Sequence, residues 1–140
     1  TADKEGEIIA GALGPHHAML LAHHGLPDQV QGLPTGRFRT AAFQTLHDQL
    51  VDAGLSSEVE AIRVGLLIEE LDIVDLQQAR ARTRNPAITA VFDNLERGSR
   101  NHLRAFNDNL LQQGVTYVPQ VITQAEWDAI ANAAEETCGG

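Results

Sequence analysis

An asparagine–proline pair between two long helical patterns is the feature that most constrains this fold. The first pattern covers residues 57–83 and opens with "SEVE", a serine followed three residues later by glutamate, as in a helix capping box. The second covers residues 86–113, with Asn85 as its cap and Pro86 at the first helical position, where proline is tolerated. Each helix is ~40 Å long at 1.5 Å per residue. The tight turn between them predicts an antiparallel helical hairpin.

Shorter helices are expected on both sides of this hairpin. Two short N-terminal helices are predicted in "TADKEGEIIAGALG" and "PHHAMLLAHH", followed by a loop rich in proline and glycine. "FRTAAFQTLHDQLVDAG" has helical spacing and is expected to end at Gly54. A last short helix opens with a second capping box, Thr123 with Glu126.

These elements predict an all-α fold, an up-down helical bundle, formed by one domain of 140 residues. Within it, residues 1–36 form an N-terminal segment with a long loop, and residues 135–140 form a flexible tail. The single cysteine, Cys138, lies in that tail, so no intramolecular disulfide can form. Cysteine usage therefore does not identify the cellular compartment.

Charge and hydropathy exclude some classes of partner. The net charge of −9 argues against general binding to nucleic acid or to an anionic membrane surface. No apolar run approaches the roughly 20 residues that span a bilayer, so we expect no membrane span. The negative charge leaves cation binding open, although most surface acids simply keep a protein soluble.

Acidic residues inside "GLLIEELDIVDLQQA" are the main candidates for a functional site. At about 100° per residue, Glu70 is surrounded by aliphatic positions one turn away on its own helix. Glu69 and Asp72 are three residues apart, so their side chains can converge on one ligand. An ionised carboxylate in a core costs several kcal/mol unless it is paired. A metal ion, protonation or an arginine partner would explain it, and the candidate arginines are Arg63, Arg80, Arg97, Arg100 and Arg104.

His102 is the expected counterpart on the following helix, on a face that is predicted to be mostly core. Carboxylate oxygen and imidazole nitrogen suit iron, manganese or zinc. The candidate metal ligands are therefore Glu69, Glu70, Asp72 and His102. No catalytic residue is assigned, because Ser99 lacks the Gly-x-Ser-x-Gly elbow of a nucleophile.

Two adjacent histidine pairs form a weaker metal candidate near the N-terminus. On a helix, His16 and His23 share one face, and His17 and His24 share another. The two histidines on each face are seven residues apart, about 10.5 Å of helical rise, which is too far for both to bind one ion. These histidines could capture copper, nickel or zinc at the surface, whereas a dedicated site would need ligands from elsewhere. The residues are His16, His17, His23 and His24.

Four stretches resemble a bacterial and archaeal domain family of unknown function in the ferritin-like superfamily, related to rubrerythrin and the erythrins. They are "LHDQLVDAG", "VGLLIEELDIVDLQQARARTRNPAI", "VFDNLERGSRNHLRAF" and "YVPQVITQAEWDAI", and the resemblance covers roughly residues 25–130. It implies a ferritin-like four-helix bundle, often exported, whose core holds a di-metal carboxylate site. Iron or another divalent metal would be the cofactor, with oxidation of Fe(II) or peroxide handling as the reaction.

Residue by residue, the resemblance carries over Glu69, Glu70, Asp72 and His102. The sequence departs from the family pattern at Ser99, where a Glu-x-x-His motif would have glutamate, and no such motif precedes residue 25. Half of the expected ligands are then missing. The N-terminal histidines or acids, or a second chain that completes the bundle, would have to replace them.

Three functions follow from these observations. The first is a ferritin-like metal-binding protein. The second is a non-catalytic structural or interaction bundle with a degenerate metal site. The third is a histidine-rich copper or nickel binder. The expected partners are a metal ion together with either further copies of the chain or another protein that completes the bundle.

Overall fold

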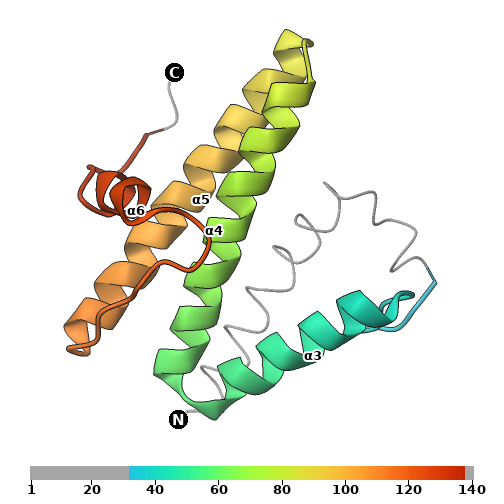
Figure 1. Ribbon diagram of the computed structural model, residues 1–140, viewed down its shortest axis with the longest axis vertical. Helices are drawn as coiled ribbons and strands as arrows, with labels where there is room; N and C mark the ends of the chain where they lie inside the picture. The colour runs from blue at the N-terminus through green and yellow to red at the C-terminus, as the bar shows by residue number, and fades with distance from the viewer. Residues whose placement is uncertain (1–31, 138–140) are drawn as a thin grey trace. The chain divides into compact units, whose positions relative to one another are not determined.

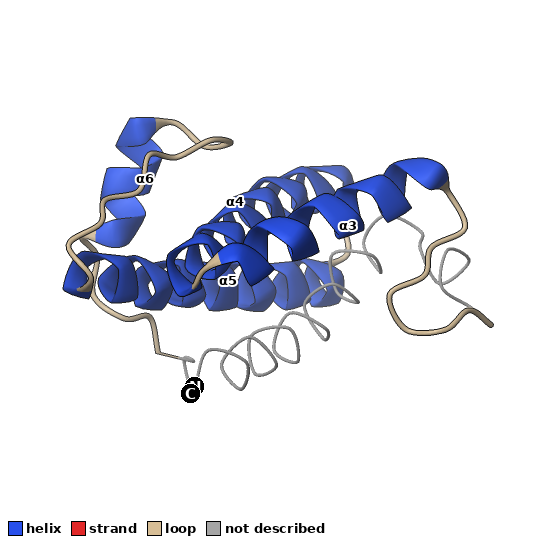
Figure 2. Cartoon of the chain, turned by 90° about the horizontal axis from the view of Figure 1, so that it is seen from below, coloured by secondary structure: helices blue, strands red, loops and turns tan. Residues whose placement is uncertain are grey.

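The computed structural model describes residues 32–137, which contain helices and loops and no strand (Figure 2). Four helices lie in this range: α3 Ala41–Ser56, α4 Glu58–Arg82, α5 Pro86–Gln112 and α6 Gln124–Ala131. The all-helical prediction is confirmed for these residues, none of whose helices is long and apolar enough to cross a membrane. The predicted N-terminal helices lie outside the described residues, as do His16, His17, His23, His24 and Cys138.

The chain divides into two compact units, residues 1–64 and 65–140, with the boundary inside α4. In the first unit, the predicted end of α3 at Gly54 is wrong, because the helix continues to Ser56. The backbone becomes extended only at Ser57, with φ −166° and ψ 164°. The Ser57 hydroxyl then accepts a hydrogen bond from the Glu60 amide at 3.1 Å, which caps the start of α4.

In the second unit, α4 from Gly65 onward and α5 form the predicted antiparallel hairpin (Figure 1). The start of α5 is as predicted, and the other bounds differ from the predicted 57–83 and 86–113 by one residue each. Four cross-helix pairs define the register: Gly65 with Phe106, Glu69 with His102, Gln77 with Glu96, and Arg80 with Asp93. A Cβ atom on Gly65 would lie 3.0 Å from the Phe106 ring, so glycine permits this close approach of the two helices.

The ends of α5 follow the sequence signals. The Asn85 side chain accepts a hydrogen bond from the Ala87 amide at 3.0 Å, with Pro86 at the first position. After the last turn, Gly114 has φ +72°, a left-handed conformation that glycine adopts without strain. The chain then leaves the helix and runs through residues 115–123 before α6 begins.

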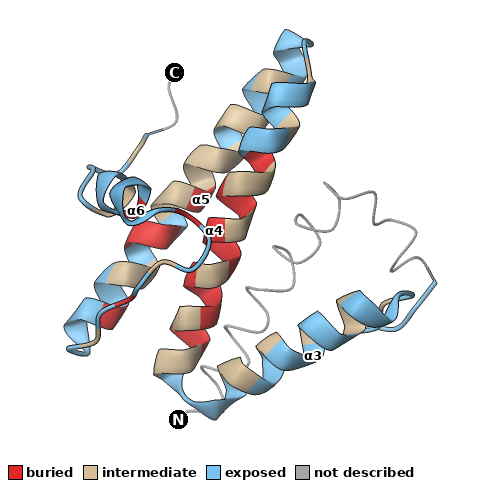
Figure 3. Cartoon of the chain, in the orientation of Figure 1, coloured by how far each residue is buried: buried red, intermediate tan, exposed pale blue. Residues whose placement is uncertain are grey.

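The core of the second unit lies along the hairpin and beneath this returning segment (Figure 3). Leu66, Leu103 and Leu110 are fully buried on the two long helices. Trp127, on α6, is buried with its ring centroid 4.9 Å from that of Tyr117. The capping box of Thr123 and Glu126 is present as predicted and starts α6, which packs on α5.

Candidate functional site

Glu70 is fully buried, and both of its carboxylate oxygens accept hydrogen bonds from the segment that returns over the hairpin. The Tyr117 hydroxyl donates to Oε1 at 2.7 Å. Three successive backbone amides donate to Oε2: Gln120 at 3.0 Å, Val121 at 2.7 Å and Ile122 at 2.9 Å. Successive amides that point at one anion form a concave binding site for negative charge. Glu70 therefore anchors residues 117–122 to α4.

This arrangement answers how a glutamate is accommodated among leucines. Hydrogen bonds to a charged acceptor contribute about 1.5–3 kcal/mol each, and several of them offset the loss of hydration of a buried carboxylate. The sequence predicted that a metal ion, an arginine or protonation would compensate the charge of Glu70. It did not predict the backbone amides. Backbone donors have no signature in a sequence; the only hint was the non-helical stretch "VTYVPQV".

Glu69, the preceding residue, lies in a different environment. It is 2% exposed, and its Oε1 lies 3.1 Å from Nδ1 of His102 on α5. Its Oε2 is buried and has no hydrogen-bond partner in the described part of the chain. Because successive residues of a helix differ by about 100° in direction, Glu69 and Glu70 point to different sides of α4.

His102 meets Glu69 across the hairpin as the sequence suggested, but the prediction that it lies on a mostly core face is wrong for its side chain. That side chain is 45% exposed. The hydrogen bond with Glu69 raises the pKa of His102, and the negative charges of Glu69 and Asp72 add to this effect against the opposing effect of burial. The imidazole thus sits at the rim of the site, next to solvent.

Asp72 lies one turn along α4 from Glu69 and is 7% exposed. Burial raises its pKa to about 7, and repulsion from Glu69 and Asp75 adds to the shift, while His102 lowers it. Strongly perturbed pKa values are common among carboxyl groups at functional sites and also occur in structural ion-pair networks. Glu69, Asp72 and His102 together are called the acid–histidine cluster below.

The arginines considered as partners for these acids are engaged elsewhere. In the described residues, each of the five contacts another group: Arg63 with Glu60, Arg80 with Asp93, Arg97 with Asn94, Arg100 with Glu96 and Glu136, and Arg104 with Glu136. An arginine partner therefore does not explain the burial of Glu69 or Asp72.

The acid–histidine cluster fits part of a metal-ligand set. Glu69 Oε1 and His102 Nδ1 lie 3.1 Å apart, a hydrogen-bond distance that also brings an oxygen and a nitrogen ligand of the kind that zinc takes close together. The unpartnered Glu69 Oε2 would be a further donor atom. Among residues 32–137, however, no three histidine, cysteine or acidic side chains converge closely enough to hold an ion.

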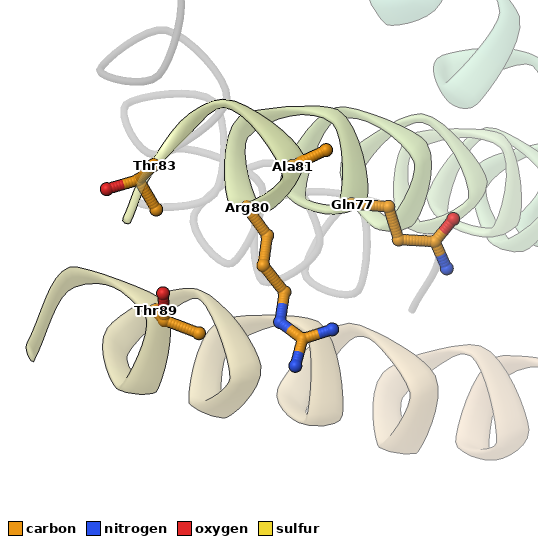
Figure 4. A pocket seen from close by; sticks show the side chains of 5 residues that line it. All are labelled: Gln77, Arg80, Ala81, Thr83 and Thr89. Carbon is orange, nitrogen blue, oxygen red and sulfur yellow. The ribbon is translucent and has the colours of Figure 1, made fainter. Parts of the chain in front are cut away.

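A separate hollow of about 310 Å³ lies at the turn end of the hairpin (Figure 4). Arg80 extends from α4 towards α5 there, and its guanidinium pairs with Asp93 at 2.6 Å. The lining residues are Gln77, Arg80, Ala81, Thr83 and Thr89. The hollow shares no lining residue with the acid–histidine cluster.

Within residues 32–137, fold and site together define an all-helical arrangement in which one of two adjacent buried glutamates, Glu69, meets a histidine on the facing helix. The chain belongs to the family described as an uncharacterized protein domain (DUF2202), whose model matches residues 16–134. The resemblance to a family of unknown function is confirmed in this form.

One relative and one solved structure extend the comparison. The chain is 41% identical over 117 residues to the uncharacterized protein MJ0754 of Methanocaldococcus jannaschii, and the alignment covers 84% of this chain. It spans 63% of the length of that relative. The crystal structure of hypothetical protein MJ0754 from Methanococcus jannaschii matches with a TM-score of 0.74 at 38% identity, covering 93% of this chain and 76% of that chain.

Proposed function

We propose that this protein binds a divalent metal ion through Glu69 and His102, with Asp72 beside them. The observation that carries the proposal is the Glu69 carboxylate, which is 2% exposed and has one oxygen without a partner in the described residues. A buried charge that is not fully compensated destabilises a protein strongly. A cation at the unused oxygen of Glu69 would supply the missing compensation. The second acid, Asp72, adds negative charge at the same place.

The donor atoms favour iron, manganese or zinc, because carboxylate oxygen and imidazole nitrogen suit these ions. An ion with so few protein ligands keeps coordination positions for water or a small molecule. Bound Fe(II) would supply oxidation chemistry towards oxygen or peroxide. The sequence resemblance to ferritin-like proteins supports this choice, and membership of that superfamily is part of the proposal.

Elemental analysis of protein purified without chelators tests metal binding. We expect a fixed stoichiometry of iron, manganese or zinc in the wild type, lost in both Glu69→Gln and His102→Ala. Glu60→Gln is a matched control, because Glu60 lies on the same helix and pairs with Arg63 at the surface. Metal-free wild type with a native helical circular dichroism spectrum would overturn the proposal.

A second candidate is a non-catalytic structural or interaction bundle. Two observations favour it: Glu70 is fully satisfied by residues 117–122, and no three-ligand group is present among residues 32–137. Ile88 and Val91, which are 42% and 53% exposed on α5, offer apolar area to another protein or another copy.

Thermal unfolding separates the two candidates. An ion that binds the folded chain stabilises it by RT ln(1 + [L]/Kd), so the unfolding temperature would rise with metal concentration. A structural bundle would show the same unfolding temperature with and without metal, and light scattering would show association instead.

A further inference from the structure

A second hollow, of about 190 Å³, lies between the helical hairpin and α6. Side chains of α4, α5, α6 and the residue just before Thr123 line it. All of these residues lie in the second unit, and none belongs to the acid–histidine cluster. A cavity of about 150 Å³ can hold benzene, so this one has room for a small organic molecule. It is called the α6 hollow below.

Aliphatic side chains make up half of the lining of the α6 hollow: Ile73, Ile122, Ala129 and Ile130. Ile73 and Ile122 are 1% and 8% exposed, so the hollow borders the core of the second unit. An apolar group that enters it would leave water and contact these side chains, which is favourable by about 25 cal/mol for each Å² of apolar surface buried. The lining therefore favours a ligand with an apolar body.

The polar side chains of the lining have unused acceptors rather than unused donor groups. Glu96 Oε1 accepts hydrogen bonds from Gln77 Nε2 at 3.0 Å and from Arg100 Nη1 at 2.8 Å. The other two nitrogens of Arg100, Nε and Nη2, donate to Glu136. In contrast, Glu96 Oε2 accepts no hydrogen bond within the described residues. The polar lining therefore favours a ligand that donates hydrogen bonds.

Glu126 adds a second carboxylate to the lining. Its Oε2 accepts from the amide and the hydroxyl of Thr123 at 2.8 Å and 2.7 Å in the capping box, and its Oε1 accepts no hydrogen bond in the described part of the chain. Two carboxylates and one guanidinium line the hollow, so its own charge is negative. The net charge of −9 on the whole chain has the same sign, and both attract a cation.

We propose that the α6 hollow binds a small organic amine in its protonated form. The ammonium group would donate to the carboxylates of Glu96 and Glu126, and the apolar body would contact the buried isoleucines. An ammonium group has three donors and no acceptor, which matches oxygens that lack donors. A carboxylate ligand of the same size would be repelled, and an alcohol would lack the charge. This site does not depend on the metal ion proposed above, because it uses none of the same residues.

Titration of the isotope-labelled full chain, followed by the nuclear magnetic resonance of its backbone amides, tests this inference. The three probes share one aromatic ring and differ in charge: benzylammonium, benzyl alcohol and phenylacetate. We expect benzylammonium to shift the amide resonances of Ile122 and Ala129 until they saturate. Benzyl alcohol should bind at least tenfold more weakly, and phenylacetate should give no saturable shift.

Two variants connect this binding to the hollow. Ala129→Leu should fill the space and weaken benzylammonium binding at least tenfold. Ala125→Leu is the matched control, because Ala125 is an exposed alanine one turn earlier on α6 that does not line the hollow; it should bind as the wild type does. Glu96→Gln keeps the shape of the side chain but removes its charge, and it should reduce the preference for benzylammonium over benzyl alcohol.

Three results would overturn the inference. The first is a wild type whose Ile122 and Ala129 resonances show no saturable shift with benzylammonium at tens of millimolar. The second is equal affinity for benzylammonium and phenylacetate. The third is unchanged benzylammonium binding in Ala129→Leu that keeps the native circular dichroism. If Ala129→Leu does not fold, Ala129→Met fills the same space with a more flexible side chain and is judged in the same way.

Discussion

Glu69 and Glu70 are neighbours on α4, identical in residue type and almost equally buried, yet their surroundings differ completely. Glu70 is 0% exposed and has a donor for each oxygen from residues 117–122. Glu69 is 2% exposed, shares one oxygen with a half-exposed His102 and leaves the other without a partner in the described residues. Burial alone therefore does not tell which acid has an unused acceptor atom; the partners of each carboxylate oxygen do.

The largest expected effect comes from removing the satisfied glutamate. Glu70→Ala would leave the Tyr117 hydroxyl and three backbone amides, among them that of the buried Ile122, without their acceptor, and we expect the free energy of unfolding to fall by about 3–5 kcal/mol. Glu69→Ala should change the stability of the metal-free protein by less than half as much. Urea unfolding followed by the emission of Trp127, the only tryptophan, measures both. Equal losses in the two variants would remove the distinction between the two glutamates.

A glycine pair tests how closely the helices must approach for Glu69 to reach His102. Gly65→Ala would place a methyl group 3.0 Å from the Phe106 ring, one turn before Glu69, and should destabilise the fold by about 1–3 kcal/mol. Gly98→Ala should stabilise it by up to about 1 kcal/mol, because a Cβ there meets nothing within 4 Å and alanine favours the helix. Thermal unfolding compares the two, and a stabilising Gly65→Ala would contradict the close approach.

Asp72→Asn tests the surroundings of Glu69, the glutamate with an oxygen that lacks a partner in the described residues. Its pKa is raised from 3.8 to about 7, so folding disfavours the charged carboxylate; the penalty is absent below about pH 3.8 and complete above about pH 7. In metal-free protein at pH 8, we expect Asp72→Asn to raise the free energy of unfolding by about 1–2 kcal/mol, less than the full shift implies. Metal should reverse the order of stability. A less stable metal-free variant at pH 8 would mean that Asp72 already has a favourable partner.

The smallest effect concerns Glu136, which lies away from both glutamates. Its pKa is lowered from 4.5 to about 2, chiefly by the hydrogen bond with Arg100, so its contribution to stability is complete above about pH 4.5 and disappears as the pH falls to 2. Because the side chain is 32% exposed, screening limits the contribution to about 1 kcal/mol. Urea unfolding between pH 2 and 6 should show the wild type losing its advantage over Glu136→Gln. A constant difference between the two chains would contradict the ion pair between Glu136 and Arg100.

Much of the hairpin could be predicted because its signals are local. The Asn85–Pro86 start of α5, the Gly114 stop and the Thr123 capping box each depend on residues a few positions apart. Gly54 failed as a stop because a glycine ends a helix only where the backbone turns left-handed, and α3 continues to Ser56. A local pattern does not show whether a glycine adopts the left-handed conformation that ends a helix or the right-handed conformation that continues it.

Features of the site were predictable only where they depend on the side-chain directions of a single helix. Helical projection identified Glu70 as enclosed, and it placed Asp72 on the same face as Glu69. It could not identify the backbone amides of residues 120–122, because a donor fifty residues away leaves no pattern around its acceptor. The exposure of His102 likewise depends on what packs beside α5, which the sequence of α5 does not specify.

Titration with Co²⁺, followed by the visible absorption of the bound ion, tests the division of roles between the two glutamates most directly. We expect a saturable spectrum in the wild type that is absent in Glu69→Gln and His102→Ala. Glu70→Gln should keep the spectrum at a temperature where it remains folded, while its free energy of unfolding falls. An unchanged spectrum in His102→Ala, or a folded Glu70→Gln that has lost the ion, would contradict this division.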